Sequence, residues 1–113
     1  MWSITTNPFR TAAGRLRVFR ENVARLVAFV GKANGALAIA RNHRAFVQAR
    51  SKNAHVCLLA VQGGNCFDAA PDCIGFDDGI ITRVTLVHLT NSALGTTNNP
   101  MSVLRGKKGL TAR

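Results

Sequence analysis

Residues 7–31 read NPFRTAAGRLRVFRENVARLVAFVG and form the most regular segment of the chain. Apolar residues recur in this segment at alternating steps of three and four, and only a helix gathers such positions on one face. Asn7 suits an N-cap, Pro8 suits the first helical position, and Gly31 suits the position after the last turn. The segment therefore predicts an amphipathic helix, whose apolar seam consists of Phe9, Ala12, Leu16, Phe19, Val23, Leu26 and Val30.

The charged residues of this helix lie off the seam and are mostly basic: Arg10, Arg15, Arg17, Arg20 and Arg25, against Glu21 as the single acid. The whole chain carries 15 Lys and Arg against 5 Asp and Glu, a formal net charge of +10. Self-repulsion of this size is relieved when a polyanion or an acidic surface neutralises it. Arginine supplies most of the cations, and its planar guanidinium suits phosphate contacts. We therefore expect a negatively charged partner.

The charges are unevenly distributed along the chain. Residues 1–66 contain Glu21 as their only acid, and residues 83–113 contain none. The other four carboxylates all lie within residues 67–82, at Asp68, Asp72, Asp77 and Asp78. This pattern predicts a basic body that is interrupted by one acidic loop.

With 113 residues, the chain has the size of one small domain. After a break at residues 32–35, a second helix is expected from Ala36 to Arg50. Its apolar face would consist of Ala36, Ile39, Ala40, His43, Phe46 and Val47, and the break suggests a helix hairpin.

The second half of the chain predicts strands. The apolar run from His55 to Val61 suits a buried strand, and Ile80 to Leu89 suits another because β-branched residues dominate it. A short strand at residues 73–76 would pair with the latter in a hairpin. The predicted fold class is α+β: an N-terminal amphipathic helix pair packed on a small two- or three-stranded sheet. Residues 1–89 would form the domain, and residues 90–113 a flexible, basic C-terminal tail.

No pattern of a catalytic or metal-binding site is found in the sequence. Cys57, Cys66 and Cys73 lack the C-x-x-C spacing of structural zinc sites, and three thiols cannot all pair within one chain. We expect free thiols in a reducing compartment, either the cytoplasm or the mitochondrial matrix. The three histidines are interpreted as structural residues, and we predict no catalytic residue, metal or cofactor and no enzymatic activity.

These observations favour a small basic protein that binds RNA, or belongs to a ribonucleoprotein, through phosphate contacts. Each cation would clamp a phosphate without reading bases. The predicted contact residues lie on the two helices and the tail: Arg15, Arg17, Arg20, Arg25, Arg41, Arg44, Arg105, Lys107 and Lys108.

Other interpretations remain open. The chain could be a structural or accessory subunit of an organellar or membrane-associated complex, with a protein partner or a lipid surface on the Phe9–Val30 helix face. The Arg-rich, acid-poor start also fits a mitochondrial targeting segment. Few acids and the lack of tyrosine would equally fit a poorly selected open reading frame without a defined function. No apolar run is long enough to predict a transmembrane segment.

Overall fold

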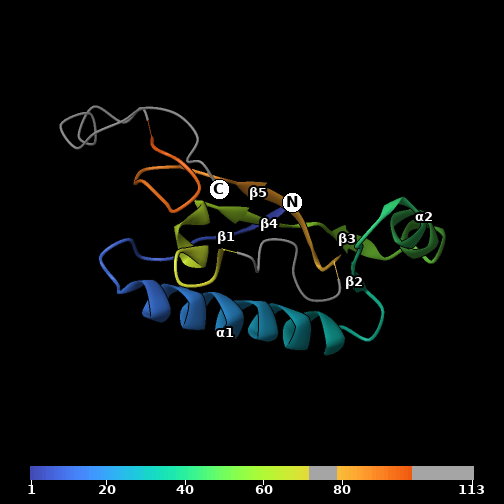
Figure 1. Cartoon of the computed structure of the whole chain (residues 1–113). Coiled ribbons are helices and arrows are strands. Elements are labelled where there is room, and N and C mark those ends of the chain that lie inside the picture. The colour runs from blue at the N-terminus through green and yellow to red at the C-terminus, as the bar shows by residue number, and fades with distance from the viewer. Residues whose placement is uncertain (72–78, 98–113) are drawn as a thin grey trace.

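The computed structural model describes residues 1–71 and 79–97, which form a mixed helix-and-strand fold (Figure 1). The predictions for the strand at residues 73–76, for Asp72, Asp77 and Asp78, and for Arg105, Lys107 and Lys108 lie outside these ranges. In chain order the described elements are β1 (Trp2–Ile4), α1 (Ala12–Gly31), β2 (Leu37–Ile39), α2 (His43–Ser51), β3 (His55–Cys57), β4 (Leu59–Gln62), the 3-10 helix η1 (Gly64–Phe67) and β5 (Ile81–Thr85).

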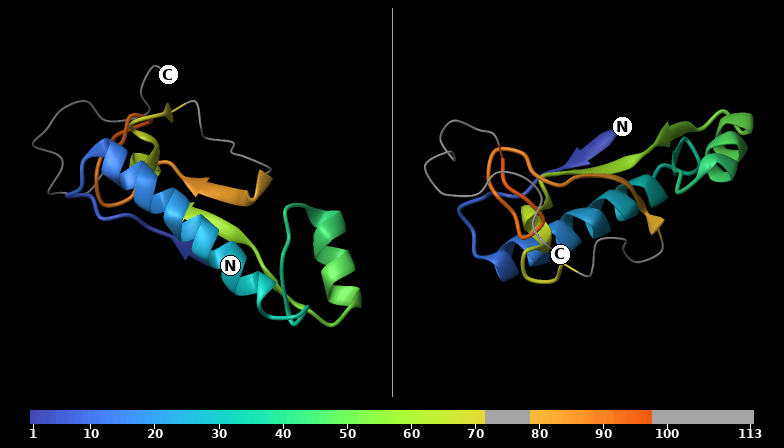
Figure 2. Two further views of the ribbon diagram at one scale, coloured as in Figure 1. Left: turned by 90° about the horizontal axis from the view of Figure 1, so that it is seen from below. Right: turned by 45° about the horizontal axis from the view of Figure 1, so that its top comes forward.

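The described strands form two small parallel sheets. The larger sheet has the order β1-β4-β5, and the smaller one pairs β2 with β3. Parallel neighbours need long crossover connections, and α1 provides part of the connection from β1 to β4. The helix runs along one face of the larger sheet, and α2 lies beside the smaller sheet at one end of the molecule (Figures 1 and 2).

The hydrophobic core lies between α1, the larger sheet and η1. The Phe19 and Phe67 rings meet edge to face, with centroids 5.1 Å apart, beside Ile4 and Val61. The middle of the predicted seam packs against this core through Leu16, Phe19, Val23 and Leu26. The seam is therefore largely covered by the chain's own sheet, and this part of it offers no open face to a partner.

The predicted start of the first helix is wrong by several residues. Thr11, not Asn7, is the N-cap, and its Oγ1 accepts a hydrogen bond from the Gly14 N–H. The Asn7 side chain instead accepts from the N–H of Phe9, which stabilises a turn before the helix. Phe9 consequently falls outside the helix, and 95% of it is exposed.

The second predicted helix is present only in its C-terminal half. Residues 37–39 form β2, which pairs with β3 in a register that matches Ala38 with Val56. Asn42 has an extended backbone and accepts from the Ala45 N–H, so α2 begins at His43. The strand therefore replaces the first turns of the predicted helix, and it also replaces the expected helix hairpin.

The part of the predicted apolar face that lies on α2 points outward. Ala45 and Ala49 lie on the partly buried side of α2, whereas Phe46 and Val47 are exposed.

No described helix combines the length and the apolarity that are needed to cross a lipid bilayer.

The two predicted strands are found, but in altered form. The run from His55 to Val61 divides into β3 and β4, which belong to different sheets. The second strand is shorter than predicted, and β5 pairs with β4 in parallel. Residues 90–97 are hydrogen-bonded to the rest of the fold, for example through the Ala93 N–H, which donates to Asp68 Oδ1 (2.6 Å).

Candidate functional site

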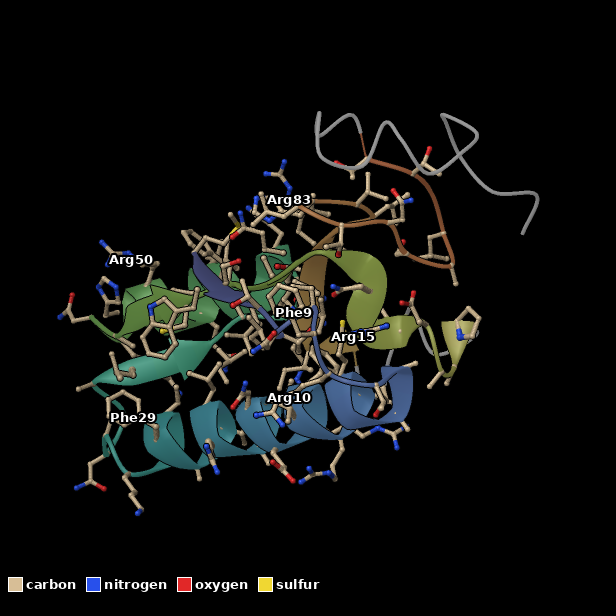
Figure 3. The ribbon with its side chains drawn as sticks, turned by 90° about the vertical axis from the view of Figure 1, so that its left-hand side faces the viewer. Phe9, Arg10, Arg15, Phe29, Arg50 and Arg83 are labelled. Carbon is tan, nitrogen blue, oxygen red and sulfur yellow. The ribbon has the colours of Figure 1, made fainter. Side chains whose placement is uncertain are left out.

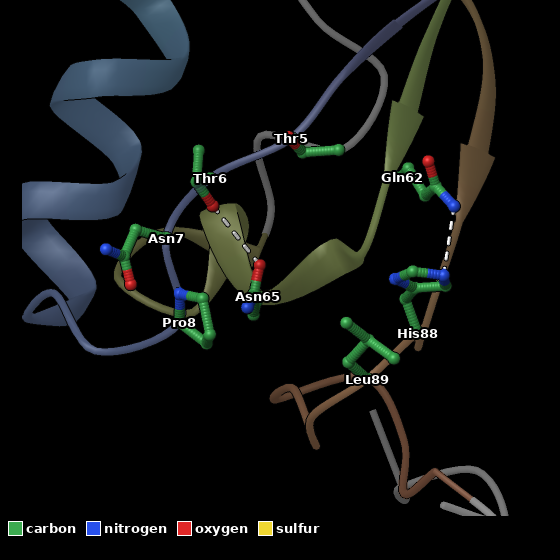
Figure 4. Close-up of a pocket in the computed structure, with 8 residues that line it drawn as sticks. All are labelled: Thr5, Thr6, Asn7, Pro8, Gln62, Asn65, His88 and Leu89. Carbon is green, nitrogen blue, oxygen red and sulfur yellow. Dashed lines mark hydrogen bonds between the residues drawn. The ribbon is translucent and has the colours of Figure 1, made fainter.

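A cavity of about 420 Å³ opens where the three strands of the larger sheet end. The carboxyl ends of parallel strands meet at one edge of a sheet, and open parallel sheets bind their ligands outside this edge. Each strand is followed by residues that line the cavity (Figure 4). These are Thr5, Thr6, Asn7 and Pro8 after β1, Gln62 and Asn65 at and after the end of β4, and His88 and Leu89 after β5.

Two consecutive glycines shape the floor of this site. Gly63 has φ +95°, in a region that favours glycine, and its N–H continues the sheet ladder by donating to the Thr85 carbonyl (3.1 Å). Gly64 passes so close to the next chain segment that a Cβ atom would lie 2.5 Å from the Leu86 carbonyl oxygen. The pair therefore lets β4 turn directly into η1 while the backbone remains in contact with the segment after β5.

Asn65 holds the three sides of the site together. It is the one buried polar residue of the described chain, at 8% exposure. Thr6 Oγ1 donates to its Oδ1 (3.3 Å), and its Nδ2 donates to Thr90 Oγ1 (3.1 Å). Because a buried amide without partners would be costly, these bonds fix the side chain and link the segments that follow β1 and β5.

Gln62 and His88 supply the accessible polar groups. The Nε2 atoms of the two side chains are 2.9 Å apart (Figure 4). Ser3 Oγ is 3.5 Å from Gln62 Oε1 and donates to it, which orients the amide so that its NH₂ group faces the imidazole. The His88 Nε2 atom then accepts, and the proton of the neutral ring lies on Nδ1.

The site can therefore hold a small polar molecule by hydrogen bonds. Gln62 and His88 offer both donors and acceptors at the rim, and Thr5 adds a hydroxyl group. Leu89 and Pro8 contribute apolar surface, as small-molecule pockets usually require. Among the described residues that line the cavity, none is a carboxylate, a lysine or an arginine.

A thiol lies directly beneath the floor of the site. Cys66 is 1% exposed, and its Sγ is 3.7 Å from the Gly63 carbonyl oxygen. Burial raises the pKa of this thiol to about 12, so it stays protonated at neutral pH and serves as core. Burial also raises the pKa of Cys57, and both described cysteines are free thiols.

The predicted phosphate-binding residues lie in different environments. Arg15 is only 12% exposed: its Nη2 is 2.6 Å from Asp68 Oδ2, and its Nε donates to the Asn65 carbonyl (2.8 Å). It thereby joins α1 to η1, just behind the cavity. Arg17 is on the surface and forms an ion pair with Glu21 (2.7 Å), which offsets its charge.

The other predicted cations on described residues are exposed and separated into two groups. Arg20 and Arg25 lie on α1, whereas Arg41 and Arg44 lie at α2. At the α2 end they are joined by exposed Lys32, Arg50 and Lys52. No Asp or Glu occurs between residues 22 and 67, so the segment that contains β2, α2 and β3 has no carboxylate side chain of its own.

The described part of the chain contains no cluster of three His, Cys, Asp or Glu side chains that could hold a metal ion. His43, His55 and His88 are all exposed, so the interpretation of His43 as a residue on a buried face is wrong. Of the three, only His88 lines the cavity at the carboxyl ends of the larger sheet.

The sequence matches no family model, and no characterised protein is significantly similar to it. The assignment of the candidate site is therefore based on its geometry alone. The residues that line it were not among those predicted from the sequence. Two signals could have indicated them: the Gly63-Gly64 pair directly after a buried strand, and His88 at the end of the next strand.

Proposed function

We propose that this protein binds a small polar ligand in the cavity at the carboxyl ends of β1, β4 and β5. The observation that carries the proposal is the convergence of three strand ends on one cavity with Gln62 and His88 at its rim. Asn65 ties these ends together, so the site is organised before a ligand arrives. The proposal concerns binding and includes no chemical step.

The test is a nuclear magnetic resonance screen of small amides, alcohols and acids against the full chain. Bound probes are expected to shift the backbone signals of residues 5–8, 62–65 and 88–89 together. Gln62→Leu and His88→Phe keep most of the side-chain volume but remove the polar groups, and each should weaken binding at least tenfold. His55→Phe is the matched control, because His55 is exposed on β3, outside the cavity. Shifts that spread over other surfaces, or equal affinity in all variants, would refute the proposal.

A second candidate function is the binding of single-stranded RNA at the α2 end. It is favoured by the exposed cations Arg44, Arg50 and Lys52, and by exposed Phe46 among them, on which a base could stack. Arg15 is left out of this interface because its guanidinium is bonded to the chain's own carboxylate and carbonyl groups.

This second candidate is tested by the salt dependence of binding to a labelled uridine oligonucleotide. Replacing Arg44, Arg50 and Lys52 together by Gln should lower the magnitude of the logarithmic salt slope by about 2, since each phosphate contact to a single strand contributes about 0.7. Arg17→Gln is the control, because Glu21 already offsets that charge. A salt-independent affinity, or an unchanged slope in the triple variant, would exclude the interface.

A further inference from the structure

The face of the larger sheet that α1 does not cover is polar. Ile4 and Val61 point into the core beneath α1, so the residues that alternate with them point to the opposite face. A register shift between Leu59 and Ala60 restores this alternation on β5, where Val84 also faces the core. This face, called uncovered because α1 does not cover it, carries Ser3, Ala60, Gln62, Arg83 and Thr85, of which Ala60 is buried.

The strand register arranges these residues in two rows. Ser3 pairs with Ala60, and Ala60 pairs with Arg83, so a methyl group stands between a hydroxyl and a guanidinium group. Gln62 and Thr85 form the next row toward the cavity. Arg83 lies opposite Ala60 on the neighbouring strand, and Gln62 lies two residues beyond Ala60. The spacing between strands and the rise along a strand together separate the Arg83 and Gln62 backbones by about 8 Å.

The Arg83 guanidinium group has no counter-charge within the described part of the chain. The residue is exposed, and its side chain extends away from α1 (Figure 3). Of the two described carboxylates, Glu21 is paired with Arg17 and Asp68 with Arg15. No hydrogen bond or ion pair joins the Arg83 side chain to residues 1–71 or 79–97, so none of these residues occupies its donors.

We infer that the ligand of the proposed cavity carries an anionic group, a carboxylate or a phosphate, which Arg83 binds. This inference rests on the proposed function. The fork of donors on arginine matches two oxygens of either group. The uncharged part of the ligand then lies toward Gln62 and His88. A molecule with an anionic group and a polar group about 5–8 Å apart fits this spacing, given the strand separations.

The experiment compares anionic probes with neutral counterparts: succinamate with succinamide, which has a carboxamide in place of the carboxylate, and glycerol 3-phosphate with glycerol, which lacks the phosphate group. Binding is followed by the backbone signals of residues 62–65 and 88. The charged member of at least one pair should bind tenfold or more tightly than its neutral partner, and the pair that does so identifies carboxylate or phosphate. Arg83→Gln should remove this difference without changing affinity for the neutral probe, whereas Arg83→Lys should keep part of it.

Arg20→Gln is the control for general charge effects, because Arg20 is exposed on α1 and lies away from the uncovered face. It should leave both affinities unchanged. Equal binding of charged and neutral probes, or an Arg83→Gln variant that retains the charge preference, would overturn the anion inference while leaving the cavity in place. Failure of every probe to shift residues 62–65 would overturn both the inference and the proposed function.

Discussion

Replacement of Arg15 by Ala should destabilise the fold strongly, because this side chain joins α1 to η1 and also donates to the Pro8 carbonyl in the turn before α1. Its guanidinium donates to Asp68 and to the carbonyl of Asn65, and the two charged side chains are only 12% and 19% exposed. Removing one partner of a buried ion pair costs 3–5 kcal/mol. Since both groups retain some contact with water, we expect Arg15→Ala to lower the free energy of unfolding by about 3 kcal/mol, the lower end of this range.

The assay is urea unfolding monitored by circular dichroism, combined with a double-mutant cycle. Arg15→Ala and Asp68→Asn should each lower the free energy of unfolding, and the pair should show a coupling energy of about 1–3 kcal/mol. Arg17→Ala provides the matched control. Its ion pair with Glu21 is 66% and 42% exposed, so its loss should cost about 0.5 kcal/mol or less. If Arg15→Ala were no more destabilising than Arg17→Ala, or if the coupling were absent, the structural role of Arg15 would be refuted.

Three other predictions concern the cavity and its floor. Gly64→Ala should lower the free energy of unfolding by about 2 kcal/mol or more, because its Cβ would lie 2.5 Å from the Leu86 carbonyl oxygen. Gly31→Ala, at the open end of α1, should leave this free energy unchanged or raise it, and urea titrations of the two variants compare them. Nitrogen-15 chemical shifts should report the Nδ1–H tautomer of neutral His88, and an Nε2–H tautomer would contradict the assigned bond to Gln62. Burial keeps Cys66 protonated in the folded state up to a pKa of about 12, whereas the ordinary pKa of a cysteine thiol is 9.0. The free energy of unfolding of the wild type should therefore fall between pH 9 and pH 12, by at most about 1.4 kcal/mol per pH unit relative to Cys66→Ala. If the free energies of unfolding of the wild type and Cys66→Ala changed with pH in parallel, the Cys66 thiol would not contribute to the pH dependence of stability.

The sequence alone was sufficient for the core-facing side of α1. Leu16, Phe19, Val23 and Leu26 recur with helical spacing, and all four lie in or against the core. The spacing could not show where the helix begins, because Asn7 and Thr11 are both good caps. The choice depends on which cap lets α1 pack on the sheet, and this is a tertiary effect.

The same limit explains the second helix and the candidate site. Leu37, Ala38 and Ile39 fit a helix or a strand equally well by local pattern, and their pairing with residues 55–57 decides for the strand. The residues of the cavity come from three segments that are far apart in the sequence. Gln62 and His88 therefore become neighbours only through the parallel order β1-β4-β5. The uneven distribution of charges, by contrast, was visible in the sequence. The burial of Arg15 was not visible there.

The most direct test of the proposed function is a crystal structure of the full chain soaked with the probes that bind in solution. We expect electron density for the probe between the ends of β1, β4 and β5, with a polar atom within hydrogen-bonding distance of Gln62 or His88. Density for the same probes on α2 or along α1, with this cavity filled only by water, would contradict the proposal.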